Sequence, residues 1–166
     1  MPSHVEPVAL APWSTVRQIV VGWFQRSFGA AGAQFTFDLT DASPSRNYSL
    51  INPDEVSAIL DGDARLDRAL YLEGQYDCED FAISARSAVT FACATAAKGG
   101  NPLPVAFGLL FTGVHALNIG IARDRKPYLY DIYYNRVWKE ETLDDALPDL
   151  TELGTGWLRT VRYVLL

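Results

Sequence analysis

The stretch that most constrains the fold is Tyr76-Asp77-Cys78-Glu79-Asp80-Phe81, which stands at the start of a long, mostly apolar segment. Its length and composition predict a helix from Asp77 to about Lys98, where Lys98-Gly99-Gly100-Asn101-Pro102 is a stop signal. Because this helix is apolar on nearly all sides, we expect it to lie buried in the centre of the protein. Cys78 would then stand at the N-terminus of a central helix.

The position of Cys78 combines two opposing electrostatic effects. The dipole and the free N–H groups of a helix N-terminus favour a thiolate, which is the nucleophilic form of cysteine. Three carboxylates beside it, those of Asp77, Glu79 and Asp80, disfavour a further negative charge. A bound cation would remove the conflict. A simpler interpretation makes Asp77 and Asp80 an ordinary helix cap and Cys78 a small buried hydrophobe, which is our interpretation of Cys93.

The composition is that of a globular protein with a single domain. The chain has 166 residues, of which 49% are hydrophobic and 12% aromatic. A formal net charge of −6 argues against nucleic-acid binding, which normally requires a basic face. No apolar run approaches the ~20 residues that a membrane span needs. The N-terminus has no pattern of a secretory signal, so we expect a cytoplasmic protein.

The two cysteines are not expected to form a disulfide. Cys78 and Cys93 are 15 residues apart. On one straight helix this separation corresponds to about 22 Å, whereas a disulfide needs Cα atoms within about 7 Å.

The order of elements predicts an α+β fold. We expect residues 1–12 to be a tail, Ser14 to cap a first helix, residues 34–39 to form a strand, and Pro53 to open a second helix that ends at Asp61-Gly62-Asp63. The Asp-x-Asp spacing at that end also suggests a calcium loop, but the rest of the twelve-residue pattern is missing. After the central helix the chain predicts antiparallel strands at 105–112, 114–123, 127–132, 136–139 and 160–166, with a short helix at 144–150.

His115 is the candidate partner for the thiol, because the other histidine, His4, lies in the expected tail. It falls in the strand 114–123, and Asp131 ends the next strand, 16 residues later. On adjacent antiparallel strands these two side chains can lie on one face, where a carboxylate would orient the imidazole. Taken singly, His115 is also compatible with a core histidine and Asp131 with a strand-end residue.

These residues resemble a known group of proteins. The run Asp77 to Ala82 is similar to the signature of the C-terminal cysteine-protease domain of fungal agglutinins and of bacterial transglutaminase-like cysteine peptidases. The agglutinin-type domain is the closer of the two, because Ala106-Phe107-Gly108 and His115-Ala116-Leu117-Asn118 also resemble it. The resemblance covers roughly residues 47–138.

This resemblance implies a papain-like or transglutaminase-like fold, with Cys78 as nucleophile, His115 as base and Asp131 as orienting acid. In the agglutinin group that acid is usually a glutamate followed by Pro-Gln, so Asp131-Ile132-Tyr133 departs from the pattern. The sugar-binding trefoil of the agglutinins has no counterpart here, so lectin activity is not implied.

The resemblance also implies a metal. Both groups depend on calcium bound by the acidic residues beside the cysteine, which implies Asp77, Glu79 and Asp80 as ligands of Ca²⁺ or of another divalent cation such as Mn²⁺. Carboxylate oxygens suit such ions. Three ligands are too few, so further oxygens must come from elsewhere, with Asp38, Asp41 and Glu73 as unranked candidates.

We therefore expect a calcium-dependent cysteine peptidase that acts on peptide or isopeptide bonds. The backbone N–H of Cys78 would donate to the oxyanion, with Gln75 as a second donor. Two alternatives remain open: a transglutaminase-like acyltransferase or deamidase, and a catalytically inactive, calcium-stabilised binding module. The expected partner is a protein or peptide substrate, with neither nucleic acid nor membrane. Tyr133, Tyr134 and Trp138 suggest a substrate cleft or a homodimer contact, although packing in the core is the simpler expectation.

Overall fold

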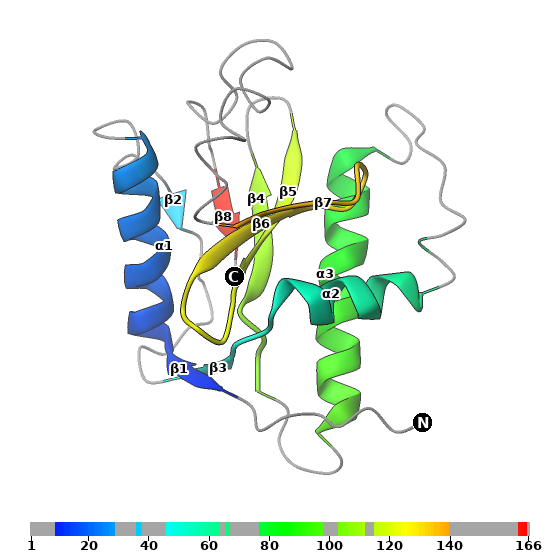
Figure 1. The fold of residues 1–166 in the computed structure, drawn as a ribbon, viewed down its shortest axis with the longest axis horizontal. Helices are drawn as coiled ribbons and strands as arrows, with labels where there is room; N and C mark the ends of the chain where they lie inside the picture. The colour runs from blue at the N-terminus through cyan, green and yellow to red at the C-terminus, as the bar shows by residue number, and fades with distance from the viewer. Residues whose placement is uncertain are drawn as a thin grey trace.

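The computed structural model describes residues 9–28, 36–37, 46–63, 66, 77–97, 103–111, 115–139 and 163–165. Within these ranges it is an α+β protein in which helices cover both faces of a mainly antiparallel sheet (Figure 1). The expected α+β class is therefore confirmed.

The six-stranded sheet has the order β2-β8-β4-β5-β6-β7. Its strands are β2 (Thr36–Phe37), β4 (Phe107–Phe111), β5 (Ala116–Ile121), β6 (Pro127–Asp131), β7 (Arg136–Lys139) and β8 (Tyr163–Leu165). All neighbours pair antiparallel except β2 and β8, which are parallel. Among the described residues, each strand predicted after residue 104 thus contains an observed strand, from β4 to β8 in the predicted order. Of the strand predicted at 34–39, only residues 36–37 are described.

Strands β4, β5 and β6 are buried on both faces, because a helix layer lies on each side. Helix α1 (Trp13–Phe28) shares a core cluster with the odd-numbered side chains of β5, namely Leu117, Ile119 and Ile121. Helix α2 (Pro53–Asp61) and helix α3 (Cys78–Ala96) pack on the opposite face. In Figure 1, α1 stands on one side of the sheet and α3 on the other, with α2 crossing α3. This arrangement explains why the sequences of these strands are mostly apolar and do not alternate between apolar and polar residues.

Helix α3 has the predicted limits, but the prediction that it is buried all round is wrong. Five residues face the protein interior: Phe81, Ala82, Ala85, Ala88 and Val89. On its outer side Ile83 is 46% exposed and Phe91 is 72% exposed. The helix belongs to an outer layer, so only one of its faces can reach the sheet. Three of its alanines, Ala82, Ala85 and Ala88, are on the inner face, where small side chains let helix and sheet approach closely.

The N-terminal prediction is also partly wrong. Residues 10–12 are not a tail, since β1 (Leu10–Pro12) pairs antiparallel with β3 (Asn47–Ser49), which the sequence did not predict. Ala11 is fully buried at this pair. Pro12 is tolerated in β1 because β1 is an edge strand, in which a missing backbone N–H need not break a hydrogen bond between strands. Helix α1 begins at Trp13, whose N–H donates to the carbonyl of Arg46 at 2.8 Å, so Ser14 lies inside the helix rather than capping it.

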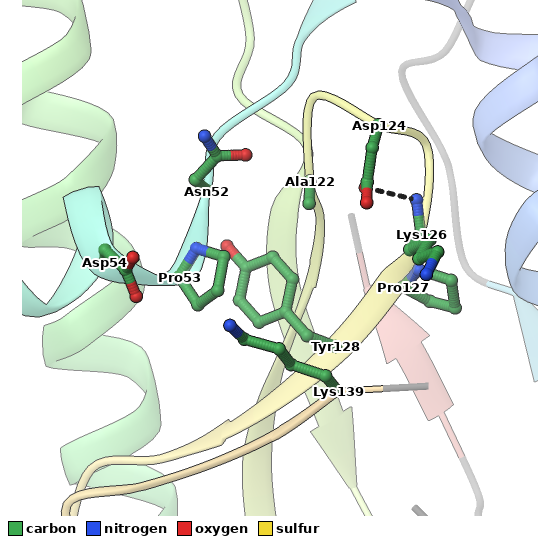
Figure 2. A pocket seen from close by; sticks show the side chains of 9 residues that line it. All are labelled: Asn52, Pro53, Asp54, Ala122, Asp124, Lys126, Pro127, Tyr128 and Lys139. Carbon is green, nitrogen blue, oxygen red and sulfur yellow. Dashed lines mark hydrogen bonds between the residues drawn. The ribbon is translucent and has the colours of Figure 1, made fainter. Parts of the chain in front are cut away.

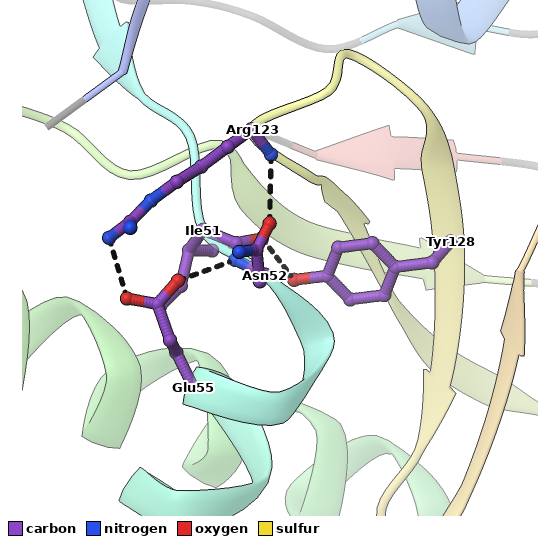
Figure 3. A network of polar contacts seen from close by, with 5 residues as sticks. All are labelled: Ile51, Asn52, Glu55, Arg123 and Tyr128. Carbon is purple, nitrogen blue, oxygen red and sulfur yellow. Dashed lines mark hydrogen bonds and ion pairs between the residues drawn. The ribbon is translucent and has the colours of Figure 1, made fainter. Parts of the chain in front are cut away.

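Helix α2 begins and ends as predicted, with Asn52 as N-cap, Pro53 in the first turn and Gly62 as C-cap. A polar network ties its start to the turn between β5 and β6 (Figure 3). Glu55 accepts from the N–H of Asn52 at 3.0 Å and pairs with Arg123 at 2.6 Å, while Asn52 Oδ1 accepts from the N–H of Arg123 at 3.0 Å. The network fixes α2 at the end of the sheet where β5 finishes.

Tyr128 completes the attachment of α2. Its hydroxyl donates to the carbonyl of Ile51 at 3.0 Å, and burial raises its pKa well above the ordinary value. Its ring lies across Gly120, where a Cβ atom would stand 2.2 Å from the ring. Glycine is therefore required at this position of β5.

Three other expectations can be compared with the structure. Both cysteines are free thiols, as their spacing predicts. Among the described residues no helix combines the length and the apolarity that a membrane span requires. The predicted helix at 144–150 lies outside the described residues.

Candidate active site

Cys78 is the first residue of α3, and the sequence around it builds the helix start. Asp77 is the N-cap in an extended conformation, and its Oδ1 accepts from the N–H of Glu79 at 3.3 Å. Asp80 reaches back, and its Oδ2 accepts from the N–H of Asp77 at 3.3 Å. This reciprocal capping box satisfies two of the N–H groups that a helix start leaves unpaired. The thiol is half-buried at this end of the helix.

His115 and Asp131 meet at neighbouring strand ends. His115 precedes β5 by one residue, rather than lying inside the strand as predicted, and Asp131 is the last residue of β6. Imidazole Nε2 and carboxylate Oδ2 are 2.8 Å apart. The register pairs Asn118 with Tyr130, so a continued ladder would put His115 opposite Tyr133 and diagonal to Asp131 on the same face. The structure therefore brings together the two residues that the strand spacing suggested.

Asp131 is held on both carboxylate oxygens. Oδ2 contacts His115, and Oδ1 accepts from the backbone N–H of Tyr134 at 3.2 Å. Only 2% of the Asp131 side chain is exposed, against 11% for His115. A buried carboxylate bound in this way has a fixed direction, so it can fix the orientation of the imidazole.

The thiol of Cys78 completes a hydrogen-bonded series with the imidazole and the carboxylate. Burial of the His115 ring by itself disfavours protonation. Hydrogen bonds to Asp131 and to Cys78, together with the negative charges of these two residues, outweigh that effect and raise the pKa of His115 to about 9. At neutral pH the imidazole is therefore protonated and places a positive charge beside the sulfur. A thiolate next to an imidazolium is the reactive pair of cysteine nucleophiles.

Asn118 is a residue of this site that the sequence did not single out as functional. It is fully buried on β5, three residues after His115. Its Nδ2 donates to the carbonyl of Ala82, in the first turns of α3, at 2.9 Å, and to the carbonyl of Gly108 on β4 at 3.1 Å. Its Oδ1 is buried without a hydrogen-bond partner. Asn118 on β5 thus connects the strand that follows His115 to the helix that carries the thiol. A polar residue inside an apolar strand was the available signal in the sequence.

The carboxylates beside Cys78 are close enough to share a cation. Ligand atoms of Asp77, Cys78 and Glu79 all lie within 4.8 Å of one another. The hydrogen bond with Asp77, followed by burial and the charges of Asp77 and Asp80, raises the pKa of Glu79, and only the charge of His115 opposes this shift. Two carboxylates that repel each other in this way fit a divalent ion. The structure does not bring Asp80 into this group, because its carboxylate points to the helix cap.

Several other predicted residues lie outside the described part of the chain. They are the second oxyanion donor, Gln75, and the candidate ligands Asp38, Asp41 and Glu73. Of the three aromatic residues, Trp138 packs against the core as expected, whereas Tyr133 and Tyr134 are 43% and 48% exposed and so do not. These two tyrosines lie two and three residues after Asp131, in the turn that reaches the Cys78 end of α3 (Figure 1).

A pocket of about 260 Å³ lies at the opposite end of the sheet (Figure 2). It is lined by residues at the start of α2, in the β5–β6 turn and on β6 and β7, among them Asn52, Asp124, Lys126 and Lys139. The six residues of β5 separate it from His115 by roughly 20 Å, at about 3.4 Å per residue. It is therefore distinct from the site at Cys78.

Neither a protein-family model nor a curated protein matches the sequence. Solved structures do match, among them one described as a Polyporus squamosus lectin bound to a human-type influenza-binding epitope, with a TM-score of 0.63, and one described as a PSL1a–E64 complex, with a TM-score of 0.64. Both are 16% identical to this chain and cover 95% of it. The chain spans only about half the length of these neighbours, 50% and 51%. The likeness establishes a shared fold.

Proposed function

We propose that this protein is a cysteine peptidase of the papain-like class, dependent on calcium or another divalent cation such as Mn²⁺, that cleaves peptide or isopeptide bonds. The observation that carries the proposal is the series Cys78, His115 and Asp131, in which the imidazole contacts the thiol on one side and the carboxylate, at 2.8 Å, on the other. We further propose a cytoplasmic location, with a protein or peptide as the partner.

The proposed mechanism begins with the Cys78 thiolate. Its sulfur attacks the carbonyl carbon of the scissile amide, a C–S bond forms, and the backbone N–H of Cys78 donates to the oxyanion. When the intermediate collapses, the C–N bond breaks, and the protonated His115 gives its proton to the leaving amine. Neutral His115 then accepts a proton from water, whose oxygen attacks the thioester. The acid leaves and the thiolate and imidazolium are regenerated.

The proposed cation belongs with Asp77 and Glu79, whose oxygens lie close together, whereas Asp80, the third predicted ligand, caps the helix. When bound, it would neutralise these carboxylates. Without it, the negative charges beside Cys78 oppose formation of the thiolate. We therefore propose that the metal sets the reactivity of the thiol rather than the shape of the substrate site.

The acyltransferase or deamidase alternative uses the same three residues, with an amine, or water at a glutamine side chain, as the acceptor. A non-catalytic binding module is the second alternative, and the shorter acid at Asp131 favours it. The carbohydrate named for one structural neighbour belongs to a chain half of which lies outside the match, so glycan binding is not part of the proposal.

The proposal is tested with denatured casein as substrate. Wild-type protein with 1–5 mM CaCl₂, on the order of what weak extracellular calcium modules require, should release new N-termini, and EGTA should reduce the rate by about tenfold or more. Cys78→Ser should abolish release, while Cys93→Ser serves as the matched control. E64, a thiol-reactive epoxide, should modify Cys78 and stop release. If casein stays intact but amine incorporation into glutamine occurs, the protein is a transferase; if neither reaction depends on Cys78, the protein is no enzyme of this class.

A further inference from the structure

Two large aromatic side chains stand exposed two and three residues after the proposed catalytic acid, Asp131. Tyr133 and Tyr134 occupy the turn between β6 and β7, and they are 43% and 48% exposed. A tight turn normally carries small polar residues, because nothing there covers an apolar side chain. Adjacent aromatic residues in such a position indicate a surface with a use.

The turn that carries these rings is held by several hydrogen bonds. The N–H of Tyr134 donates to Asp131 at 3.2 Å, and the N–H of Asn135 donates to the carbonyl of Ile132 at 3.2 Å. The hydroxyl of Tyr130 donates to Asn135 Oδ1 at 3.0 Å, and Asn135 itself adopts a left-handed conformation with φ of 48°. Asparagine tolerates this conformation better than most residues. The backbone of Tyr134 is therefore bound to the same carboxylate that orients His115, and Tyr133 precedes it in the same turn.

The rings form a row between α3, the helix that carries Cys78, and the imidazole of His115. Ring centroids are 5.8 Å apart for Phe81 and Tyr133, 4.7 Å for Tyr133 and Tyr134, and 6.4 Å for Tyr134 and His115. Phe81 lies three residues after Cys78 on α3. The row thus runs from the helix of the thiol to the imidazole, and both of its middle members are open to solvent. A substrate residue beside the bond under attack would lie against them.

We propose that Tyr133 and Tyr134 form a specificity surface, which binds an aromatic or large aliphatic side chain of the substrate next to the scissile bond. This inference rests on the proposed function and adds its substrate class. Aromatic faces and edges favour contact with other rings and with apolar groups. Because the turn is hydrogen-bonded and the two rings already contact one another, less of the protein has to become ordered when the substrate side chain packs on them.

Three alkylating reagents test the inference independently of the natural substrate. Iodoacetamide carries no side chain, whereas the chloromethyl ketones of N-blocked phenylalanine and N-blocked glycine differ only in the benzyl group. All three react by displacement of halide by the Cys78 thiolate. We expect the phenylalanine reagent to label Cys78 roughly tenfold faster than the glycine reagent, a preference of the size expected for a contact between aromatic rings.

The variants distinguish recognition from reactivity. Tyr133→Ala/Tyr134→Ala should reduce the phenylalanine-to-glycine ratio to within about twofold of unity and leave the iodoacetamide rate unchanged, while the Phe variants of both positions should keep the ratio. Phe91→Ala is the matched control, because Phe91 is 72% exposed on the same helix but about 20 Å of helix rise away from Cys78. A ratio that survives the double alanine variant, or that falls equally in Phe91→Ala, overturns the inference. If wild-type Cys78 reacts with iodoacetamide no faster than a free thiol, the proposed function fails and the inference fails with it.

Discussion

The two thiols of this protein lie on one helix and differ in almost every property of their surroundings. Cys78 starts α3 and contacts an imidazole whose pKa is about 9, with carboxylates on either side. Cys93 lies near the other end, half-buried against the cluster of α2 and β6, and burial together with the charge of Glu55 raises its pKa. One helix therefore carries a thiol beside a positive charge and a thiol that is kept neutral.

The comparison shows that the charge state of a cysteine depends less on the residue type than on its position in the helix. At the start of α3, N–H groups are available and two strand ends deliver His115 and Asp131. Near its end, the helix offers carbonyl oxygens and apolar neighbours, which favour the neutral thiol. The following predictions test the difference between these two surroundings.

The largest effect is expected when the thiols are replaced in turn. Cys78→Ser should lower the rate of casein cleavage by about 10³-fold or more, because a serine in this position lacks a base matched to its hydroxyl. Cys93→Ser should leave the rate within about twofold, since its sulfur contacts no reacting group. N-terminus release at fixed calcium measures both. Equal losses in the two variants would contradict the assignment of Cys78 as nucleophile.

Asp131→Asn should reduce cleavage by about 10²-fold or more, because the amide keeps the shape of the carboxylate but not its charge. Loss of that charge should also move the pKa of His115 down from about 9 toward its ordinary value of 6.5. NMR titration of the imidazole Cε1–H measures the shift, with Asp124→Asn, an exposed carboxylate of the β5–β6 turn, as control. An unchanged titration would mean that Asp131 does not act through His115.

The raised pKa of His115 also makes stability depend on pH. The folded protein binds the proton more tightly than the unfolded chain, so the stabilisation is fully present below pH 6.5 and is lost as pH rises toward 9. The difference corresponds to at most about 3 kcal/mol in the free energy of unfolding. Urea unfolding at pH 6, 7, 8 and 9 should show this decline in the wild type and a flatter profile in His115→Gln. Parallel profiles would argue against a proton held at His115.

A smaller effect is expected at Asn118. Asn118→Leu keeps the volume of the side chain but removes both donors to Ala82 and Gly108, and should cost about 2 kcal/mol. Because the hydrogen bond to Ala82 holds the Cys78 end of α3, alkylation of Cys78 should slow severalfold in this variant, while the alkylation rate of Cys93 should stay unchanged. Ser57→Ala, which removes a 3.4 Å contact with Tyr130 on the Cys93 side, is the control. If both variants slow Cys78 equally, Asn118 has no specific positioning role.

Much of this arrangement is foreseeable from the chain. The limits of α2 and α3 follow from their caps, since Asn52-Pro53 and Asp77 with Asp80 are strong local signals. The pairing of His115 with Asp131 follows from strand spacing.

Other features of the structure depend on long-range contacts that local sequence patterns do not encode. Pairing of β1 with β3 turns an apparent tail into a strand, and the outer position of α3 exposes Phe91. Asn118 acts through carbonyls of two other elements, which no sequence period reveals.

The central claim is that the surroundings of Cys78 activate it while those of Cys93 do not. Competitive labelling with iodoacetamide at pH 6, with calcium present and glutathione as the free-thiol reference, tests it on one molecule; mass spectrometry reports both sites. We predict that Cys78 reacts at least about 100-fold faster than glutathione and that Cys93 reacts more slowly than glutathione. In His115→Gln the rate at Cys78 should fall to that of glutathione or below. Equal rates at the two cysteines of the wild type, or a fast Cys78 without His115, would contradict the claim.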